Sequence, residues 1–128
     1  MVRWRIEFFR DEHGRRPVVD WLDALAPEVR GRVLARIDLL AEHGPTLDFP
    51  YTSQIEARLR EIRLRFGKTR YRVLYFFDDS RTGILLHAFA KDTEAIESVD
   101  KQLGIARMNA HLERTQKPQK KKTKKGGK

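Results

Sequence analysis

Cysteine is absent from the 128 residues of this chain, which excludes disulfide bonds and thiol chemistry. No apolar run approaches the roughly 20 residues that a membrane-spanning helix needs. Residues 1–9 carry charges throughout their apolar run, so they lack the continuous hydrophobic region of a secretory signal peptide. These absences predict a cytosolic protein without a membrane partner.

Residue patterns for metal and nucleotide chemistry are also missing. The chain has no Gly-rich phosphate loop and no serine turn of the kind that carries a hydrolase nucleophile. Glu61 is the only acid in residues 59–77, whereas a divalent-ion site needs several converging carboxylates. The four histidines show no pair at metal-ligand spacing on a common element: His13, His43, His87 and His111. We therefore expect neither a metal nor another cofactor.

Positive charge is plentiful but unevenly placed. The formal net charge is +9, from 27 Lys and Arg against 18 Asp and Glu. Seven lysines follow Gln116 without an acid, so the rest of the chain holds 20 basic and 18 acidic residues. We predict one folded domain over residues 1–115 and a disordered lysine-rich tail over residues 116–128, which has no apolar side chain to bury. The tail either keeps the protein soluble or attracts polyanions such as RNA without specificity.

The hydrophobic pattern predicts an α+β fold. Residues 59–66, 69–77 and 83–91 alternate with a period of two and are separated by short turns, which is typical of antiparallel strands. Residues 2–9 predict a first strand, and residues 46–55 an extended connection. Helical stripes begin at Pro17 and Pro27, and the second helix ends at Gly44. After Lys91 a last helix is expected, with Thr93 as its N-cap. We expect a small antiparallel-rich sheet, with the helical hairpin on one face, and a C-terminal helix.

The alternation also places basic side chains together. One face of the three strands is predicted to gather Arg63, Arg65, Arg70, Arg72 and Lys91. In the last strand Leu85, His87, Phe89 and Lys91 share one side. Guanidinium groups opposite one another repel, so such a face is expected to meet an anion, and planar Arg suits phosphate. The alternative is a solvated hairpin whose charges discourage aggregation. Both interpretations stay open.

These residue types fit RNA cleavage without a metal. The reaction needs a base for the ribose 2′-OH, cations for the phosphorane and an acid for the departing 5′-oxygen. Arg63, Arg65 and Arg72 are the candidates for binding the phosphate, and Lys91 for proton transfer. Glu61 is either a base or an ion-pair partner of Arg63 or Arg72. The candidates for further RNA contacts are Arg60, Lys68, Arg70 and His87.

Five segments carry a resemblance to a known family. They are PVVDWLDAL at residues 17–25, Gly44-Pro45 with Leu47 and Pro50-Tyr51 in the connection at 44–51, LREIR at 59–63, YRVLY at 71–75 and LLHAFAK at 85–91. In this order and spacing, over about residues 2–113, the sequence resembles the phage-derived, HigB-like branch of the RelE/ParE toxin superfamily.

The resemblance implies the toxin of a type II toxin–antitoxin system, an endoribonuclease that cuts mRNA on the ribosome. It also implies a cognate antitoxin encoded in the adjacent gene, often a helix-turn-helix protein. Arg63, Arg72 and Lys91 match basic active-site positions of the family. The chain departs from it at Asp92, where relatives often carry a second Lys, and it lacks the Pro before the last helix. Because some superfamily members inhibit gyrase instead, a non-catalytic toxin or an RNA- or ribosome-binding module is the alternative.

Overall fold

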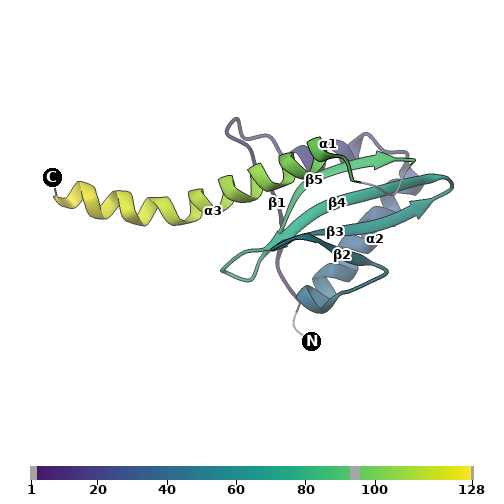
Figure 1. Cartoon of the computed structure of the whole chain (residues 1–128), viewed down its shortest axis with the longest axis horizontal. Coiled ribbons are helices and arrows are strands. Elements are labelled where there is room, and N and C mark those ends of the chain that lie inside the picture. Colours follow the sequence, from purple (N-terminus) through teal and green to yellow (C-terminus); the bar gives the residue numbers. More distant parts are fainter. Residues whose placement is uncertain (1–2, 93–95, 128) are drawn as a thin grey trace.

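Five strands form one sheet that separates two helical layers (Figure 1). The computed structural model describes residues 3–92 and 96–127, with side chains as far as residue 116. The strands are β1 (Ile6–Phe8), β2 (Thr52–Glu56), β3 (Leu59–Phe66), β4 (Thr69–Phe77) and β5 (Gly83–Lys91). The helices are α1 (Pro17–Asp23), α2 (Pro27–His43) and α3 (Ser98–Gly127), with a short 3₁₀ helix, η1 (Gly44–Thr46), after α2. The predicted α+β class is confirmed.

The strands lie in the order β1-β5-β4-β3-β2, and β1 runs parallel to β5 while the other neighbours are antiparallel. The three central strands have the predicted bounds. β1 is shorter than the predicted stretch, because the N–H of Trp4 already donates to the carbonyl of Ala41 in α2 at 2.8 Å. β2 begins within residues 46–55, which were predicted as an extended connection, and pairs with β3 from Thr52 opposite Ile62 onward.

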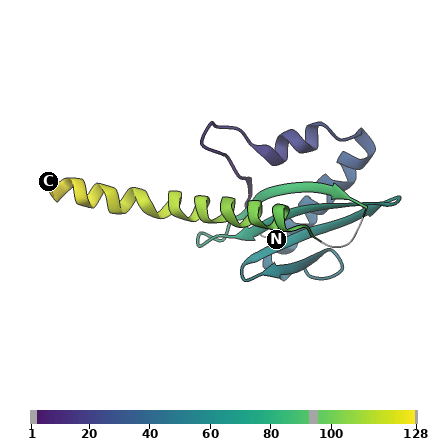
Figure 2. The ribbon, with the colours of Figure 1, turned by 45° about the horizontal axis from the view of Figure 1, so that its top comes forward.

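Both faces of the sheet carry a hydrophobic core. The helices α1 and α2 cover one face, and α3 crosses the other (Figures 1 and 2). The first core contains mainly aliphatic side chains, among them Val18, Leu22, Val33, Leu40, Ile62, Val73 and Leu85. The second contains Leu59, Leu74, Phe76, Ile84, Leu86, Phe89 and Met108. The face that was predicted to be basic is therefore half apolar, because α3 buries one end of it.

One extra residue, Leu86, interrupts the alternation of β5. The register between β4 and β5 shifts between Leu74 and Tyr75, so that Leu86 is left over as a β-bulge. The sequence predicts Leu85 and Phe89 on one face, but Leu85 packs beneath α1 and α2 whereas Phe89 packs with α3. That prediction is wrong because the bulge resets the period-two pattern in the middle of the strand.

The last helix, α3, runs from Ser98 to Gly127. The composition, in contrast, predicts a disordered tail from residue 116. The division of the chain at residue 115 stays a prediction. The predicted N-cap, Thr93, lies outside the described residues. Within the described part of the chain, no helix combines the length and the apolar character that crossing a membrane requires.

Two histidine–aspartate pairs fasten α3 to the sheet. His87 Nε2 lies 2.7 Å from Asp100 Oδ1, and His111 Nε2 lies 2.9 Å from Asp78 Oδ2 in the turn after β4. Oδ1 of Asp78 also accepts hydrogen bonds from the backbone N–H groups of Ser80 and Thr82. Burial raises the pKa of Asp78, but the hydrogen bonds from His111, Ser80 and Thr82 outweigh it and hold the pKa below its ordinary value of 3.8.

The end of α2 depends on a glycine. Gly44 has φ 62° and ψ −144°, a region that is open almost only to glycine. A Cβ at this position would also overlap the indole ring of Trp4. In contrast, Gly31 lies inside α2, and a Cβ added there would meet nothing within 4 Å.

We expect opposite effects from the same substitution at these two glycines. Gly44→Ala lowers the free energy of unfolding by at least about 1–3 kcal/mol, because the backbone conformation is strained for alanine and the methyl group meets Trp4. Gly31→Ala raises it by about 0.5–1 kcal/mol, since alanine favours the helical conformation. Urea unfolding of both variants measures the difference. Equal destabilisation by both would contradict the conformation assigned to Gly44.

The anchor at Asp78 makes stability depend on pH. Asp78→Asn removes the charge that faces His111, which should cost about 1.5–3 kcal/mol of unfolding free energy near pH 7. Because the folded-state pKa is lowered, this contribution is present above the ordinary value of 3.8 and is lost as pH falls through the folded-state pKa. Urea unfolding at pH 7 and pH 3 should therefore show the gap between wild type and variant closing at low pH. A gap that stays constant would mean that the Asp78 charge does not stabilise the fold.

Candidate active site

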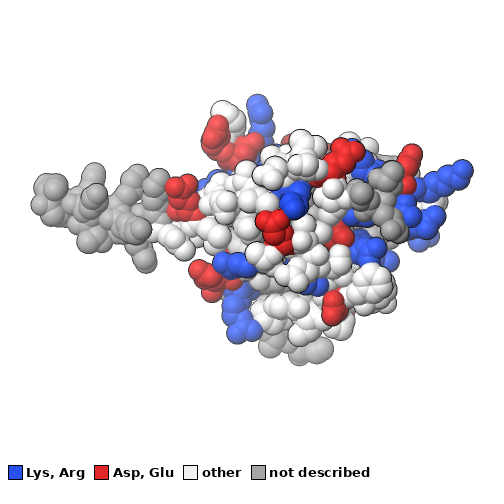
Figure 3. Space-filling model, viewed as in Figure 1, with Lys and Arg blue, Asp and Glu red and all other residues white. Residues whose placement is uncertain are grey.

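The β3–β4 hairpin brings the basic side chains together in pairs. Arg63 lies opposite Arg72, Arg65 lies opposite Arg70, and Arg70 lies opposite Lys91 across to β5. Figure 3 shows Lys and Arg gathered over this end of the sheet. Like charges in such cross-strand pairs oppose strand pairing, so this end needs compensating contacts.

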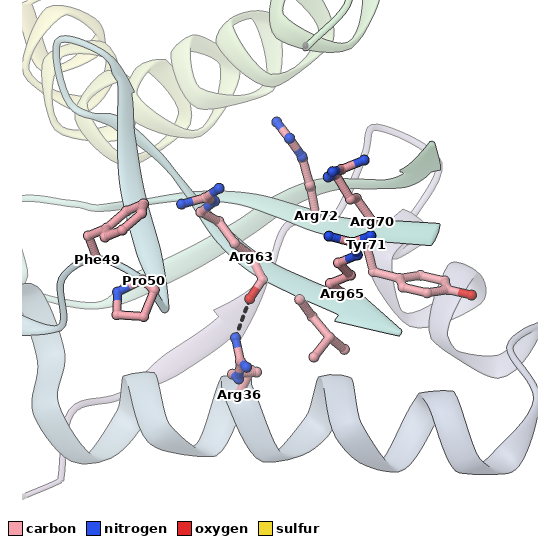
Figure 4. A pocket seen from close by; sticks show the side chains of 9 residues that line it. Arg36, Phe49, Pro50, Arg63, Arg65, Arg70, Tyr71 and Arg72 are labelled. Atoms are coloured by element: carbon pink, nitrogen blue, oxygen red, sulfur yellow. Dashed lines mark hydrogen bonds between the residues drawn. The ribbon is translucent and has the colours of Figure 1, made fainter. Parts of the chain in front are cut away.

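A cavity of about 280 Å³ lies beside the free part of β3 (Figure 4). The cavity exists because β2 pairs with β3 only up to Ile62. One further hydrogen bond joins the N–H of Arg63 to the carbonyl of Tyr51 at 2.9 Å. Beyond it the segment that precedes β2 turns away from β3. Among the residues that the structure describes, five arginines and no acidic residue line it: Arg36, Arg63, Arg65, Arg70 and Arg72. The remaining lining residues are Phe49, Pro50, Leu64 and Tyr71. Such a lining suits a polyanionic ligand, above all a phosphodiester.

Glu61 is buried beneath the arginines. Its Oε1 lies 3.1 Å from Nη1 of Arg72, and the side chains of both residues are 5% exposed. Its Oε2 accepts a hydrogen bond from Ser53 at 2.7 Å and lies 3.7 Å from Nε of Arg63. The ion-pair role predicted as one alternative for Glu61 is the one that the structure shows. This carboxylate offsets the repulsion between the two arginines and fixes the Arg72 side chain beside the cavity.

Arg36 was not identified from the sequence. Its Nη1 donates to the carbonyl of Arg63, and its guanidinium lies 5.1 Å from the centre of the Tyr51 ring. Burial lowers the pKa of Arg36, and Tyr51 acts in the opposite direction. The available signal was its position next to Ile37 in the buried stripe of α2, which points the flank of that helix toward β3.

Four predicted site residues lie outside the cavity lining, and three of them lie away from the arginine cluster. Arg60 lies on the face of the sheet that α1 and α2 cover, where it donates hydrogen bonds to the hydroxyls of Tyr75 and Thr52. Lys68 is exposed in the β3–β4 turn. His87 is held by Asp100 and does not line the cavity. These positions separate Arg60 and His87 from the four arginines of the hairpin.

Lys91, the fourth, lies next to the arginine cluster without lining the cavity. Its Nζ is 3.3 Å from Oε1 of Glu97, in an ion pair whose side chains are 34% and 54% exposed. At Asp92, where the sequence departs from the resemblance, the backbone carbonyl accepts a hydrogen bond from Arg70 at 2.8 Å.

No three His, Asp or Glu side chains converge, as a metal site would require, in the part of the chain whose side chains the structure describes. That part comprises residues 3–92 and 96–116.

Comparisons with known proteins agree with the resemblance seen in the sequence. Residues 20–109 match the family described as phage derived protein Gp49-like (DUF891). The chain is also 32% identical over 118 residues to a Mycobacterium tuberculosis protein named "Putative toxin HigB2". That match covers 83% of this chain and 57% of the relative, so the chain spans little more than half of the relative's length. The chain belongs to the phage-derived Gp49-like family, the HigB-like branch of the RelE/ParE toxin superfamily.

Proposed function

We propose that this protein is the toxin of a type II toxin–antitoxin system and that it cleaves mRNA on the ribosome without a metal ion. The observation that carries the proposal is the cavity of about 280 Å³ lined by five arginines at the end of the β3–β4 hairpin. A guanidinium group offers several N–H donors in one plane, which matches the oxygens of a phosphodiester. Family membership supports the same proposal.

In this proposal the ribose 2′-OH attacks the neighbouring phosphorus and the 5′-oxygen leaves. Arg63 and Arg72 bind the non-bridging oxygens and stabilise the extra negative charge that develops in the transition state. Arg65, at the exposed end of β3, and Arg70 opposite it bind an adjacent phosphate or help Arg63 and Arg72 to bind the reacting one. The products are a 2′,3′-cyclic phosphate and a 5′-hydroxyl.

Lys91 is the candidate for proton transfer. Its present partner, Glu97, forms a largely solvated ion pair with it, and such pairs contribute only about 0–1 kcal/mol. RNA that approaches the cavity can therefore draw the ammonium group away from Glu97 at little cost. The distance between Lys91 and the arginine cluster is one strand spacing, because Lys91 lies opposite Arg70.

A second candidate function is a non-catalytic toxin, either a gyrase inhibitor or a binding module for RNA or the ribosome. The ion pairs favour it, since the buried Arg72 is already neutralised by Glu61 and Lys91 is paired with Glu97. A site that binds RNA without cutting it would need the arginines but no residue that transfers a proton.

We further propose that the toxin acts in the cytosol and is neutralised by an antitoxin from the adjacent gene, a helix-turn-helix protein. Growth arrest on induction of this chain, relieved when the neighbouring reading frame is expressed with it, would support that pairing. Arrest that the neighbour does not relieve would contradict it.

We expect Arg63→Ala to lower the rate of RNA cleavage by about 10²–10³, by analogy with the loss of one transition-state donor. The fold should persist, because Glu61 keeps its contacts with Arg72 and Ser53. Arg72→Ala would be ambiguous, since it leaves a buried charge unpaired at a cost of about 3–5 kcal/mol. Mapping mRNA 5′ ends after induction at matched expression measures the effect.

The control for Arg63→Ala is Arg5→Ala, which removes the same charge from a side chain that is 73% exposed next to β1. Cleavage by that variant should equal that of wild type. If Arg63→Ala and Arg5→Ala cleave equally well, Arg63 does not contact the reacting phosphate.

The nucleophile is tested with a message in which the scissile nucleotide carries a 2′-deoxy ribose. We expect this message to stay whole on ribosomes that contain the toxin, because the attacking oxygen is missing while the phosphates remain. The unmodified message should end in a 2′,3′-cyclic phosphate or the 3′-phosphate formed from it. Cleavage of the substituted message, or a product with a 5′-phosphate, would overturn the mechanism. Growth arrest without cleavage of any message would favour the non-catalytic alternative.

A further inference from the structure

Phe49 is an aromatic side chain that the fold leaves in solvent. Its exposed fraction is 67%, the largest among the large hydrophobic residues that the structure describes and just above that of Val99 at 66%. Isolated exposed hydrophobic residues are common on protein surfaces and need no explanation. Phe49, however, stands at the rim of the cavity with five arginines, in the segment between η1 and β2 (Figure 4).

Hydrogen bonds on both sides hold the backbone of this segment. Oδ1 of Asp48 accepts the N–H of Phe49 at 2.8 Å, and the carbonyl of Asp48 accepts the N–H groups of Tyr51 and Thr52 at 3.0 and 3.2 Å. The buried hydroxyl of Thr52 donates to the carbonyl of Leu47 at 2.6 Å. A ring on such a backbone is preorganised, so a ligand that stacks on it does not have to order the loop first.

A cation already lies against the ring. The guanidinium carbon of Arg63 is 4.8 Å from the centre of the Phe49 ring. The same Arg63 lines the cavity where the proposed function places a phosphate. A ring surface and a phosphate-binding cation are therefore next to each other, and single-stranded nucleic acids are bound by just this combination of stacked bases and neutralised backbone.

We propose that Phe49 is a stacking platform for one nucleobase of single-stranded RNA, beside the phosphate held by Arg63. This inference rests on the proposed function and adds the element that recognises a base, which the arginines alone do not supply. A purine offers the larger stacking surface, so the subsite prefers adenine or guanine to a pyrimidine. A duplex is excluded from the subsite because its bases are not free to unstack onto the ring.

The test compares two fluorescein-labelled probes of about eight nucleotides, within the usual site size for single-stranded nucleic acid, both with 2′-O-methyl riboses that block cleavage. One is oligoadenylate and the other has the same sugar–phosphate backbone without bases. Wild type should bind oligoadenylate about 5- to 150-fold more tightly than the abasic probe, the range for one stacked base. Phe49→Leu should bind both probes with nearly equal affinity, and Phe49→Trp should keep the preference of wild type.

The control variant is Leu34→Ala, which shortens a different exposed hydrophobic side chain, on α2 and outside the cavity lining. It should keep the full preference for bases. If wild type prefers oligoadenylate and Phe49→Leu keeps that preference, the stacking role of Phe49 is wrong while RNA binding stands. Equal binding of both probes by wild type also overturns the stacking role. If wild type binds neither probe, the proposed RNA chemistry itself fails, and this inference fails with it.

Discussion

The buried ion pair between Glu61 and Arg72 decides whether the basic end of the sheet can form. Arg63 lies opposite Arg72, and Arg65 lies opposite Arg70, so repulsion between like charges opposes the pairing of β3 and β4 at this end. Glu61 reaches Arg72 at 3.1 Å and Arg63 at 3.7 Å from a position that is 5% exposed. This carboxylate therefore offsets part of the repulsion among the arginines at this end of the sheet.

Much of this fold follows from local sequence. At the basic ends of β3 and β4 apolar residues face α1 and α2 and arginines face the other side, so the period of two is strong there. Pro17 and Pro27 mark the first residues of α1 and α2. The arginines of the site were predictable for the same reason, since alternation places Arg63 and Arg65 on one side of β3. Their assembly into a cavity was not, because it depends on where β2 stops.

The features that sequence could not predict are those that depend on distant contacts. β2 has no strong pattern of its own and forms because β3 offers it a partner. Arg36 joins the site through the packing of α2 on β3, and the exposed position of Phe49 depends on the turn around Asp48. The spacing of residues along the chain does not show which distant residues come into contact. The pairing of Lys91 with Glu97 likewise depends on the path of the chain into α3.

The bulge at Leu86 has a consequence for insertions and deletions. It allows Leu85 to face α1 and α2 while Phe89, four residues later, faces α3. Deletion of this one residue would return β5 to strict alternation and turn either the first or the second half of the strand to the wrong face. The strand would tolerate an exchange of leucine for another apolar residue far better than the loss of the position. In β5 the number of residues is as strictly constrained as their hydrophobicity.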